Sequence, residues 1–220
     1  MTTELELFLK DHIDLIRKEE FNTLVHQVAG ETKQELCALL CEIGWFDTSE
    51  KWINADITLG KYCPEHVDVP EGVTYISNDI FSGSFNLKSV KLPQTLERIK
   101  YSCFYNSGIT SIRVPDSVRF IEAEAFEACY NLEYATLPAT LQEIGWGIFN
   151  DCVRLKSITI PRSVRFIGDE AFCNCKSLKR INYQGTVEEW DNIQIDNTSF
   201  IDVPDKTVHC IDGYAKADII

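Results

Sequence analysis

Residues 160–183 read IPRSVRFIGDEAFCNCKSLKRINY, and this stretch decides the fold because its pattern recurs along the chain. Cys173 and Cys175 stand two apart in it, which raises the question of whether they mark a chemical site or one unit of a repeat. No second Cys or His cluster follows at the spacing of metal ligands, so the pair is a poor zinc site. Comparing the stretch with the rest of the chain answers the question.

Five prolines mark a repeat: Pro70, Pro93, Pro115, Pro138 and Pro161 are 23, 22, 23 and 23 residues apart. The third residue after each proline is Val or Leu, and each unit ends close to L-x-x-I-x-L. The sixth residue is always Ile and the eleventh always Phe, which gives two columns: Ile76, Ile99, Ile121, Ile144 and Ile167, then Phe81, Phe104, Phe126, Phe149 and Phe172. A unit this short cannot bury its apolar face alone, so the period predicts a solenoid of stacked turns.

The end of each unit predicts a β-strand. Its last two apolar positions alternate with polar ones, the period of two that a half-buried strand requires. Stacked copies predict a parallel sheet, and each proline follows its strand, where the missing N–H is tolerated. Cys175 falls in a column of small residues with Ser84, Ser107, Cys129 and Cys152, so we interpret it as a packing residue, whereas Cys173 lies off the column.

Residues 161–181, PRSVRFIGDEAFCNCKSLKRI, resemble the leucine-rich repeats of the BspA-like (treponemal-type) family, whose unit reads roughly I-P-x-S-V-T-x-I-G-x-x-A-F-x-x-C-x-x-L-x-x-I. Residues 115–137 follow this unit nearly as closely. The resemblance covers about 64–183, and about 64–210 with the C-terminal extension. It implies a leucine-rich-repeat solenoid with a parallel β-sheet and a short, irregular convex side. It also implies cell-surface, adhesive or host-interaction roles, which many members perform with export signals.

We expect five repeats plus a partial one, at 61–183, between a helical N-terminal unit at 1–60 and a C-terminal cap at 184–220. An open solenoid needs caps. Two S/T-x-x-E patterns before apolar residues at helical spacing predict the N-terminal helices. That unit has 12 acidic and 5 basic residues, so it is either the solvated face of a cap or a docking module. Candidate lid residues of the C-terminal cap are Tyr183, Val187, Trp190, Ile193 and Ile195.

The composition narrows the class of protein. The formal net charge of -13 disfavours nucleic acid and anionic membrane as general partners, because phosphate binding requires compensating Lys and Arg. No stretch has the length and apolarity of a membrane span or the features of a secretory signal, so the sequence predicts a cytoplasmic location. Nine cysteines fit reduced, buried thiols. The sequence leaves the oligomeric state open.

The search for chemistry finds no catalytic arrangement. The four histidines are scattered and match no nucleophile, base or metal motif: His12, His26, His66 and His209. Gly145-Trp146-Gly147 lacks the rest of a dinucleotide-binding loop. We therefore expect no catalytic residues, no metal ligands and no cofactor, and a protein that is not an enzyme.

The outward positions of the predicted strands form the first candidate binding surface. Six of these fifteen positions are basic and one is acidic, although the whole chain has 34 acidic and 21 basic residues. The candidate residues are Lys88, Lys91, Arg113, Tyr134, Lys156, Lys179 and Arg180. They suit a protein partner with an acidic surface patch, or a phosphate-bearing ligand as the less favoured choice. Alternatively, the strands carry Ser, Thr and Lys for solubility alone.

A second candidate stripe lies two residues after the first apolar position of each unit and contains Tyr75, Arg98, Phe120, Glu143 and Phe166. Its aromatic residues, Tyr75, Phe120 and Phe166, form an adhesive stripe if they face solvent, or pack beneath a cap or one another.

The sequence thus predicts a non-enzymatic protein-protein interaction module. It binds a partner through the strand face, the acidic helical unit or both. Its compact layout favours an inhibitor of a host factor, encoded by a mobile element or bacteriophage. The alternative hypothesis is a surface or secreted adhesive protein of the BspA-like type.

Overall fold

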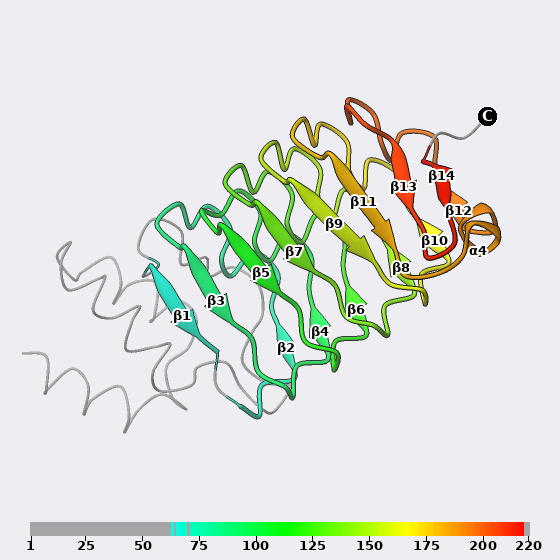
Figure 1. Cartoon of the computed structure of the whole chain (residues 1–220). Helices are drawn as coiled ribbons and strands as arrows, with labels where there is room; N and C mark the ends of the chain where they lie inside the picture. The colour runs from blue at the N-terminus through cyan, green and yellow to red at the C-terminus, as the bar shows by residue number, and fades with distance from the viewer. Residues whose placement is uncertain (1–62, 64, 70, 218–220) are drawn as a thin grey trace, which may run out of the picture.

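The computed structural model describes residues 63, 65–69 and 71–217. In this range the chain winds into a solenoid in which two layers of strands alternate along the sequence (Figure 1). The predicted leucine-rich-repeat solenoid is therefore confirmed. The helical unit expected at 1–60 lies outside the described residues and stays a prediction.

One layer contains the longer strands, and we call its outward side the long-strand face. Its strands are β1 (His66–Asp68), β3 (Ser89–Lys91), β5 (Ser111–Arg113), β7 (Tyr134–Thr136), β9 (Ser157–Ile160), β11 (Arg180–Tyr183), β13 (Thr207–His209) and β14 (Tyr214–Lys216). Their pairs are parallel, as predicted, except that β14 runs antiparallel to β13. β1 and β3 form one sheet and β5 to β14 another, so the layer is interrupted between β3 and β5.

The second layer contains strands of two residues, and we call its outward side the short-strand face. Its strands are β2 (Tyr75–Ile76), β4 (Arg98–Ile99), β6 (Phe120–Ile121), β8 (Glu143–Ile144), β10 (Phe166–Ile167) and β12 (Gln194–Ile195). They form two parallel sheets, β2-β4-β6 and β8-β10-β12, which separate between β6 and β8. The two layers are thus interrupted at different turns of the solenoid.

A single file of phenylalanine rings lies between the layers. The five predicted rings stack with centroids 5.0, 5.3, 5.4 and 5.6 Å apart and interplanar angles of 12° or less. All five side chains are fully buried. The fixed period produces this file because equivalent positions of successive turns occupy the same place in the core. Aromatic pairs at such distances contribute about 0.5–1.5 kcal/mol each beyond the area that they bury.

The cysteine column lies beside the rings. The thiols of Cys129, Cys152 and Cys175 are buried and donate to the backbone carbonyls of Phe104, Phe126 and Phe149, at 3.0, 3.1 and 3.2 Å. Burial raises the pKa of Cys129 to about 12 and also raises the pKa of Cys175. These thiols therefore remain protonated at neutral pH and act as small hydrogen-bonding core residues, which agrees with the interpretation of Cys175.

The C-terminal segment adds a turn that the repeat pattern does not show. Phe200 stacks on Phe172 at 5.1 Å and extends the file to six rings. Helix α4 (Val187–Asp191), which begins with a capping box of Thr186 and Glu189, lies within this turn and lengthens it. Trp190 of the helix is buried and donates its Nε1–H to the Lys216 carbonyl at 3.0 Å. The last turn of the solenoid is thereby joined to the terminal strand β14.

The second full repeat has 22 residues and tolerates the deletion because of a glycine. A Cβ on Gly108 would lie 2.1 Å from the Phe85 carbonyl oxygen, so the backbones of the two turns approach at a distance that only glycine allows. This short repeat ends in β5, next to the interruption between β3 and β5.

Candidate interaction surface

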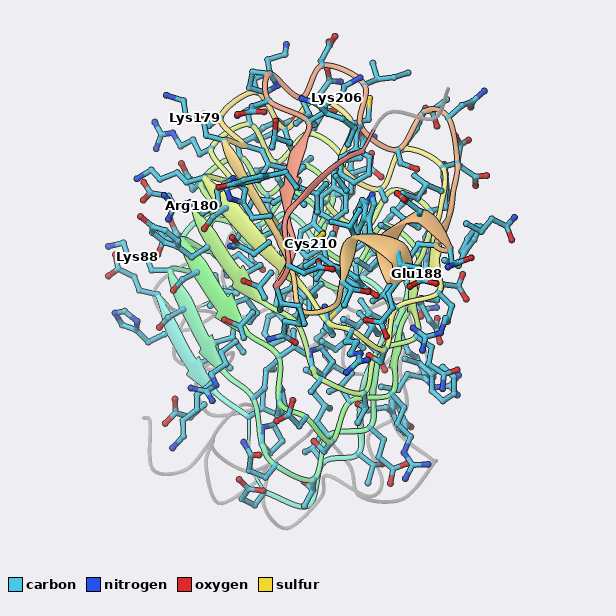
Figure 2. All side chains as sticks on the ribbon, turned by 45° about the vertical axis from the view of Figure 1, so that its right-hand side comes forward. Lys88, Lys179, Arg180, Glu188, Lys206 and Cys210 are labelled. Atoms are coloured by element: carbon cyan, nitrogen blue, oxygen red, sulfur yellow. The ribbon has the colours of Figure 1, made fainter. Side chains whose placement is uncertain are left out.

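The strand register aligns the residues of the first candidate surface in rows on the long-strand face. Tyr134 lies opposite Ser157, which lies opposite Arg180, and Arg113 lies opposite Thr136. Each lies beside a buried residue such as Ile112, Ala135 or Ile158, so the row faces solvent. Figure 2 shows Lys88, Lys179 and Arg180 projecting from the same side of the solenoid.

Two of the six basic side chains are paired within the face. Lys88 lies 2.7 Å from Glu65, and Lys156 lies 2.5 Å from Glu133. The hydrogen bond from Lys88 lowers the pKa of Glu65, and the one to Glu133 raises the pKa of Lys156. These exposed pairs neutralise charge locally and contribute little to folding.

The other four cations, Lys91, Arg113, Lys179 and Arg180, form no ion pair with any residue that the structure describes. They occupy β3 and β5 near one end and β11 with its preceding residue near the other. Tyr134 is 52% exposed between them, and Lys156 Nζ lies 5.5 Å from its ring centre. The face therefore presents one pair of such cations on each side of an exposed tyrosine.

The structure adds residues to this face that the repeat pattern missed. β13 and β14 extend the sheet beyond β11 and bring Lys206, His209, Tyr214 and Lys216 to it, and β1 adds Glu65, His66 and Asp68. With these strands the face has eight basic and three acidic residues, so the excess of positive charge persists. The signal for β13 was the alternation in Thr207-Val208-His209, but it lies outside the regular spacing.

A hollow opens on this face where the sheet is interrupted. Thr110 N–H still donates to the Lys88 carbonyl at 3.1 Å, but β3 and β5 do not pair beyond that point. The hollow has a volume of about 470 Å³, and Lys91, Gln94 and Arg113 line it beside Val90 and Leu92. Two unpaired cations at a concave site favour an anionic group of a ligand.

The second candidate stripe lies on the short-strand face. Tyr75, Arg98 and Phe120 are adjacent in one sheet, and Glu143 and Phe166 in the other. Phe120 is 55% exposed and has the Arg98 guanidinium 4.8 Å from its ring centre, while Lys100 Nζ lies 4.4 Å from the Tyr75 ring. Charged groups thus interrupt the three aromatic rings, which do not form one continuous apolar stripe.

The described part of the chain has neither a cluster of metal-ligating residues nor a membrane-spanning helix. No group of three or more His, Cys, Asp or Glu in this part has an arrangement that would hold a metal ion. None of its helices has the length and apolarity needed to cross a membrane.

Solved structures with the same kind of repeat resemble this chain. A leucine-rich repeat protein from Eubacterium ventriosum is 17% identical, with a TM-score of 0.50 over 66% of this chain and 41% of its own. One from Bacteroides ovatus is 25% identical, with a TM-score of 0.46 over 58% of this chain and 44% of its own. The T. pallidum Leucine Rich Repeat protein is 19% identical, with a TM-score of 0.41 over 60% and 74%. This chain thus spans less than half of the first two proteins.

No curated protein matches this chain. The family described as BspA type Leucine rich repeat region matches residues 60–179 with six copies of its repeat, where the spacing of the prolines alone indicated five and a partial one. Repeats of this kind indicate protein-protein interaction or adhesion in general terms, and such solenoids are typically binding modules rather than enzymes. The chain belongs to the BspA type leucine-rich-repeat family.

Proposed function

We propose that this protein is an interaction module whose long-strand face binds an acidic surface of a partner protein. The observation that carries the proposal is the set of four cations without an ion-pair partner among the described residues: Lys91, Arg113, Lys179 and Arg180. They stand on one face of a chain whose net charge is -13. A local charge of opposite sign to the rest of the molecule orients an approaching partner and excludes competitors.

The rest of the face suits close approach by another protein. Small residues such as Ser111, Ser157 and Thr159 separate the cations, so a partner can reach the sheet without displacing bulky side chains. Tyr134 supplies an exposed aromatic group of the type that often dominates binding energy. The strands that position these groups are fixed by the buried file of rings, so little conformational entropy is lost on binding.

The experiment is affinity purification of partners from a host-cell extract with quantitative mass spectrometry. The test variant reverses three charges of the face, with Lys91→Glu, Arg113→Glu and Arg180→Glu. We expect recovery of specific partners to fall by about tenfold or more, since charged contacts across interfaces govern association and specificity. Binding to the unmodified face should also weaken as salt is raised, because salt screens exposed charges.

The matched control carries Lys100→Glu, Arg154→Glu and Lys176→Glu, which change the net charge by the same amount away from the cationic groups of the long-strand face. Its recovery of partners should stay close to that of the unmodified chain. Equal losses in the two variants would assign the effect to net charge, and no loss in the test variant would reject the long-strand face as the binding surface.

The biological setting stays a prediction. Inhibition of a host factor by a mobile-element or bacteriophage protein and adhesion at a cell surface both use surface recognition of this kind. Genomic neighbourhood and the longer reading frame separate them, since an export signal upstream favours adhesion and neighbouring phage genes favour inhibition.

A further inference from the structure

The short-strand layer is joined from turn to turn by a pair of backbone hydrogen bonds, with one exception. In the first bond, the N–H of the fourth residue after each proline, or of its equivalent in the last turn, donates to a carbonyl of the preceding turn. The pairs are Glu97 to Thr74, Arg119 to Glu97, Arg165 to Gln142 and Gln194 to Arg165, at 2.7 to 3.1 Å. In the second bond, the donor N–H lies three residues after the first donor, or two residues after it in the last turn. The pairs are Lys100 to Ile76, Glu122 to Ile99, Gly168 to Ile144 and Asp196 to Ile167, at 2.8 to 3.0 Å.

Both bonds are missing at the step from β8 to β6. By equivalence, Gln142 N–H should donate to the Arg119 carbonyl and Gly145 N–H to the Ile121 carbonyl. Neither bond forms, although both do at each of the four other steps between described short strands. Two donors and two acceptors of the backbone thus lack their usual partners. Backbone polar groups without protein partners need water or a ligand.

Hydrogen bonds join the two turns again on both sides of this gap. Before it, the Thr140 hydroxyl donates to the Val118 carbonyl at 3.1 Å, as the Ser163 hydroxyl does to Leu141 in the next turn. After it, Glu124 N–H donates to the Trp146 carbonyl at 3.0 Å. The result is a slot between residues 119–123 and 142–145 rather than a general separation of two turns. It has a volume of about 830 Å³, in the range of sites that hold small ligands or short peptides.

The slot has aromatic walls and small residues between them. Phe120 and Trp146 line it and are 55% and 46% exposed. Ala123 and Gly145 also line it, at positions where other turns carry larger side chains such as Tyr101 and Lys100. A Cβ on Gly145 would meet no atom closer than 3.7 Å, so this side of the backbone has open space.

The charges of the slot cancel. Arg98 pairs with Glu122 at 3.3 Å, and Arg119 and Glu143 add one charge of each sign. The slot therefore does not select a ligand by net charge, in contrast to the long-strand face. Its selectivity must come from hydrogen bonds and from apolar contact.

We infer that this slot binds a peptide segment of a partner protein that inserts an Asn or Gln side chain beside an apolar residue. A carboxamide has a carbonyl acceptor and an N–H₂ donor in one plane, so it supplies both kinds of partner that the backbone lacks. A carboxylate or phosphate offers only acceptors, and a guanidinium only donors. The apolar neighbour packs against Phe120 and Trp146. This site is separate from the proposed function of the long-strand face.

Amide hydrogen exchange measured by NMR tests the free protein. We expect the amides of Gln142 and Gly145 to exchange much faster than their equivalents one turn later, Arg165 and Gly168, which are hydrogen-bonded in the ladder. Equal protection of the two sets would show that the ladder is closed in solution and would overturn the inference.

Binding is tested with a phage-displayed library of random heptapeptides selected on the full chain, and the affinity of the enriched peptides is then measured on Gly145→Leu. This substitution fills the slot, and the free space at Gly145 predicts that the variant folds. Trp146→Ala removes a wall of the slot and serves as a second variant. We expect enriched peptides to carry Asn or Gln next to an apolar residue. Their affinity should fall by about tenfold or more in either variant, as for loss of a buried, hydrogen-bonded contact.

Two controls separate this site from the rest of the molecule. Phe85→Ala removes another exposed aromatic residue, 62% exposed and outside the slot, and should leave the affinity unchanged. Replacing the peptide's Gln by Glu should abolish binding, because the carboxylate cannot donate. Peptides that are acidic and lose affinity only with Lys91→Glu and Arg113→Glu would instead report the long-strand face. That result, a library without enriched peptides, or equal affinity for Gly145→Leu would overturn the inference.

Discussion

The long-strand face and the short-strand face are built by the same repeat over the same file of phenylalanine rings, yet they offer a ligand different chemistry. The long-strand face has an excess of positive charge, and four of its cations form no ion pair within the described part of the chain. The short-strand face has a slot whose charges cancel, and backbone groups between β6 and β8 lack their usual ladder partners there. The buried columns fix the fold, so the outward positions are free to differ.

The two interruptions extend this comparison. The long-strand layer opens between β3 and β5, where Lys91 and Arg113 line a cationic hollow. The short-strand layer opens between β6 and β8, where Phe120 and Trp146 line a neutral slot. At the other steps between described strands the ladders are continuous, so these two concave sites lie where the strands of successive turns do not pair. A solenoid thus gains specific sites without changing its core.

The largest expected effect is on the free energy of unfolding, and it distinguishes the buried file of rings from the exposed faces. Phe126 lies between Phe104 and Phe149 at 5.3 and 5.4 Å and is fully buried. Phe126→Ala should lower the free energy of unfolding by about 3–5 kcal/mol, because it leaves a cavity in the core. Phe120→Ala, six residues earlier, should change it by less than about 0.5 kcal/mol, since its side chain is largely exposed. Urea denaturation followed by circular dichroism measures both, and similar losses would contradict the placement of the two rings.

The next effect compares two equivalent glycines on the short-strand face. A Cβ on Gly168 would lie 3.1 Å from the Gly145 carbonyl carbon and the Trp146 nitrogen, whereas a Cβ on Gly145 has open space. Gly168→Ala should therefore destabilise the fold by about 1–3 kcal/mol, as overpacking does. Gly145→Ala should be neutral or stabilise it by up to about 1 kcal/mol. Urea denaturation of both variants measures this difference in stability. Equal costs would mean that the slot beside Gly145 is closed.

A third effect concerns the turns that join the two faces. Burial, together with the nearby carboxylates of Glu124, Asp151 and Glu170, raises the pKa of Glu127 from 4.5 to about 7. The folded state then binds a proton more tightly than the unfolded chain. Its contribution to stability is present below about pH 4.5 and is lost as the pH rises through about 7. Because solvent screens the partly exposed group, the change is about 1 kcal/mol or less.

NMR titration of the Glu127 side chain measures this pKa directly, and Glu127→Gln should remove the corresponding slope of stability with pH. Glu97→Gln, which replaces an exposed carboxylate, provides the control and should keep the slope. A Glu127 titration midpoint near that of an ordinary glutamate would contradict the expected field of neighbouring carboxylates.

The fold was predictable from the sequence because its signal is repeated. Each buried column, such as the phenylalanines, appears five times at fixed spacing, and each copy supports the others. Phe200 was missed for the complementary reason: α4 inserts residues into the last turn, so Phe200 lies 28 positions after Phe172 instead of 23. The basic side chains of the strands face outward, as the period of two predicts, while their role in binding stays a prediction.

The interruptions were not predictable, because they depend on small differences between turns with the same apolar pattern. From the sequence, Gly145 and Trp146 were noted only as part of an incomplete dinucleotide-binding loop. In the structure they line the slot. A usable signal existed in Ala123, which stands where other turns carry larger side chains such as Tyr101 and Asp169. Gly145 gives a weaker signal, because Gly168 occupies the same column at a step where the ladder is closed. Single sequences do not show whether such replacements open a ladder or are filled by neighbours. The three-dimensional register settles that.

The smallest expected effect tests whether the charges of the long-strand face serve folding. Lys88 and Glu65 are paired at 2.7 Å, but their side chains are 55% and 57% exposed. Solvent weakens their attraction, and holding two long side chains costs entropy. Lys88→Ala, Glu65→Ala and the double variant should therefore leave the denaturation midpoint unchanged within error. The double-mutant cycle should show no coupling between the two positions. A measurable coupling would mean that the face is charged for stability, and the case for binding would then depend on the four unpaired cations alone.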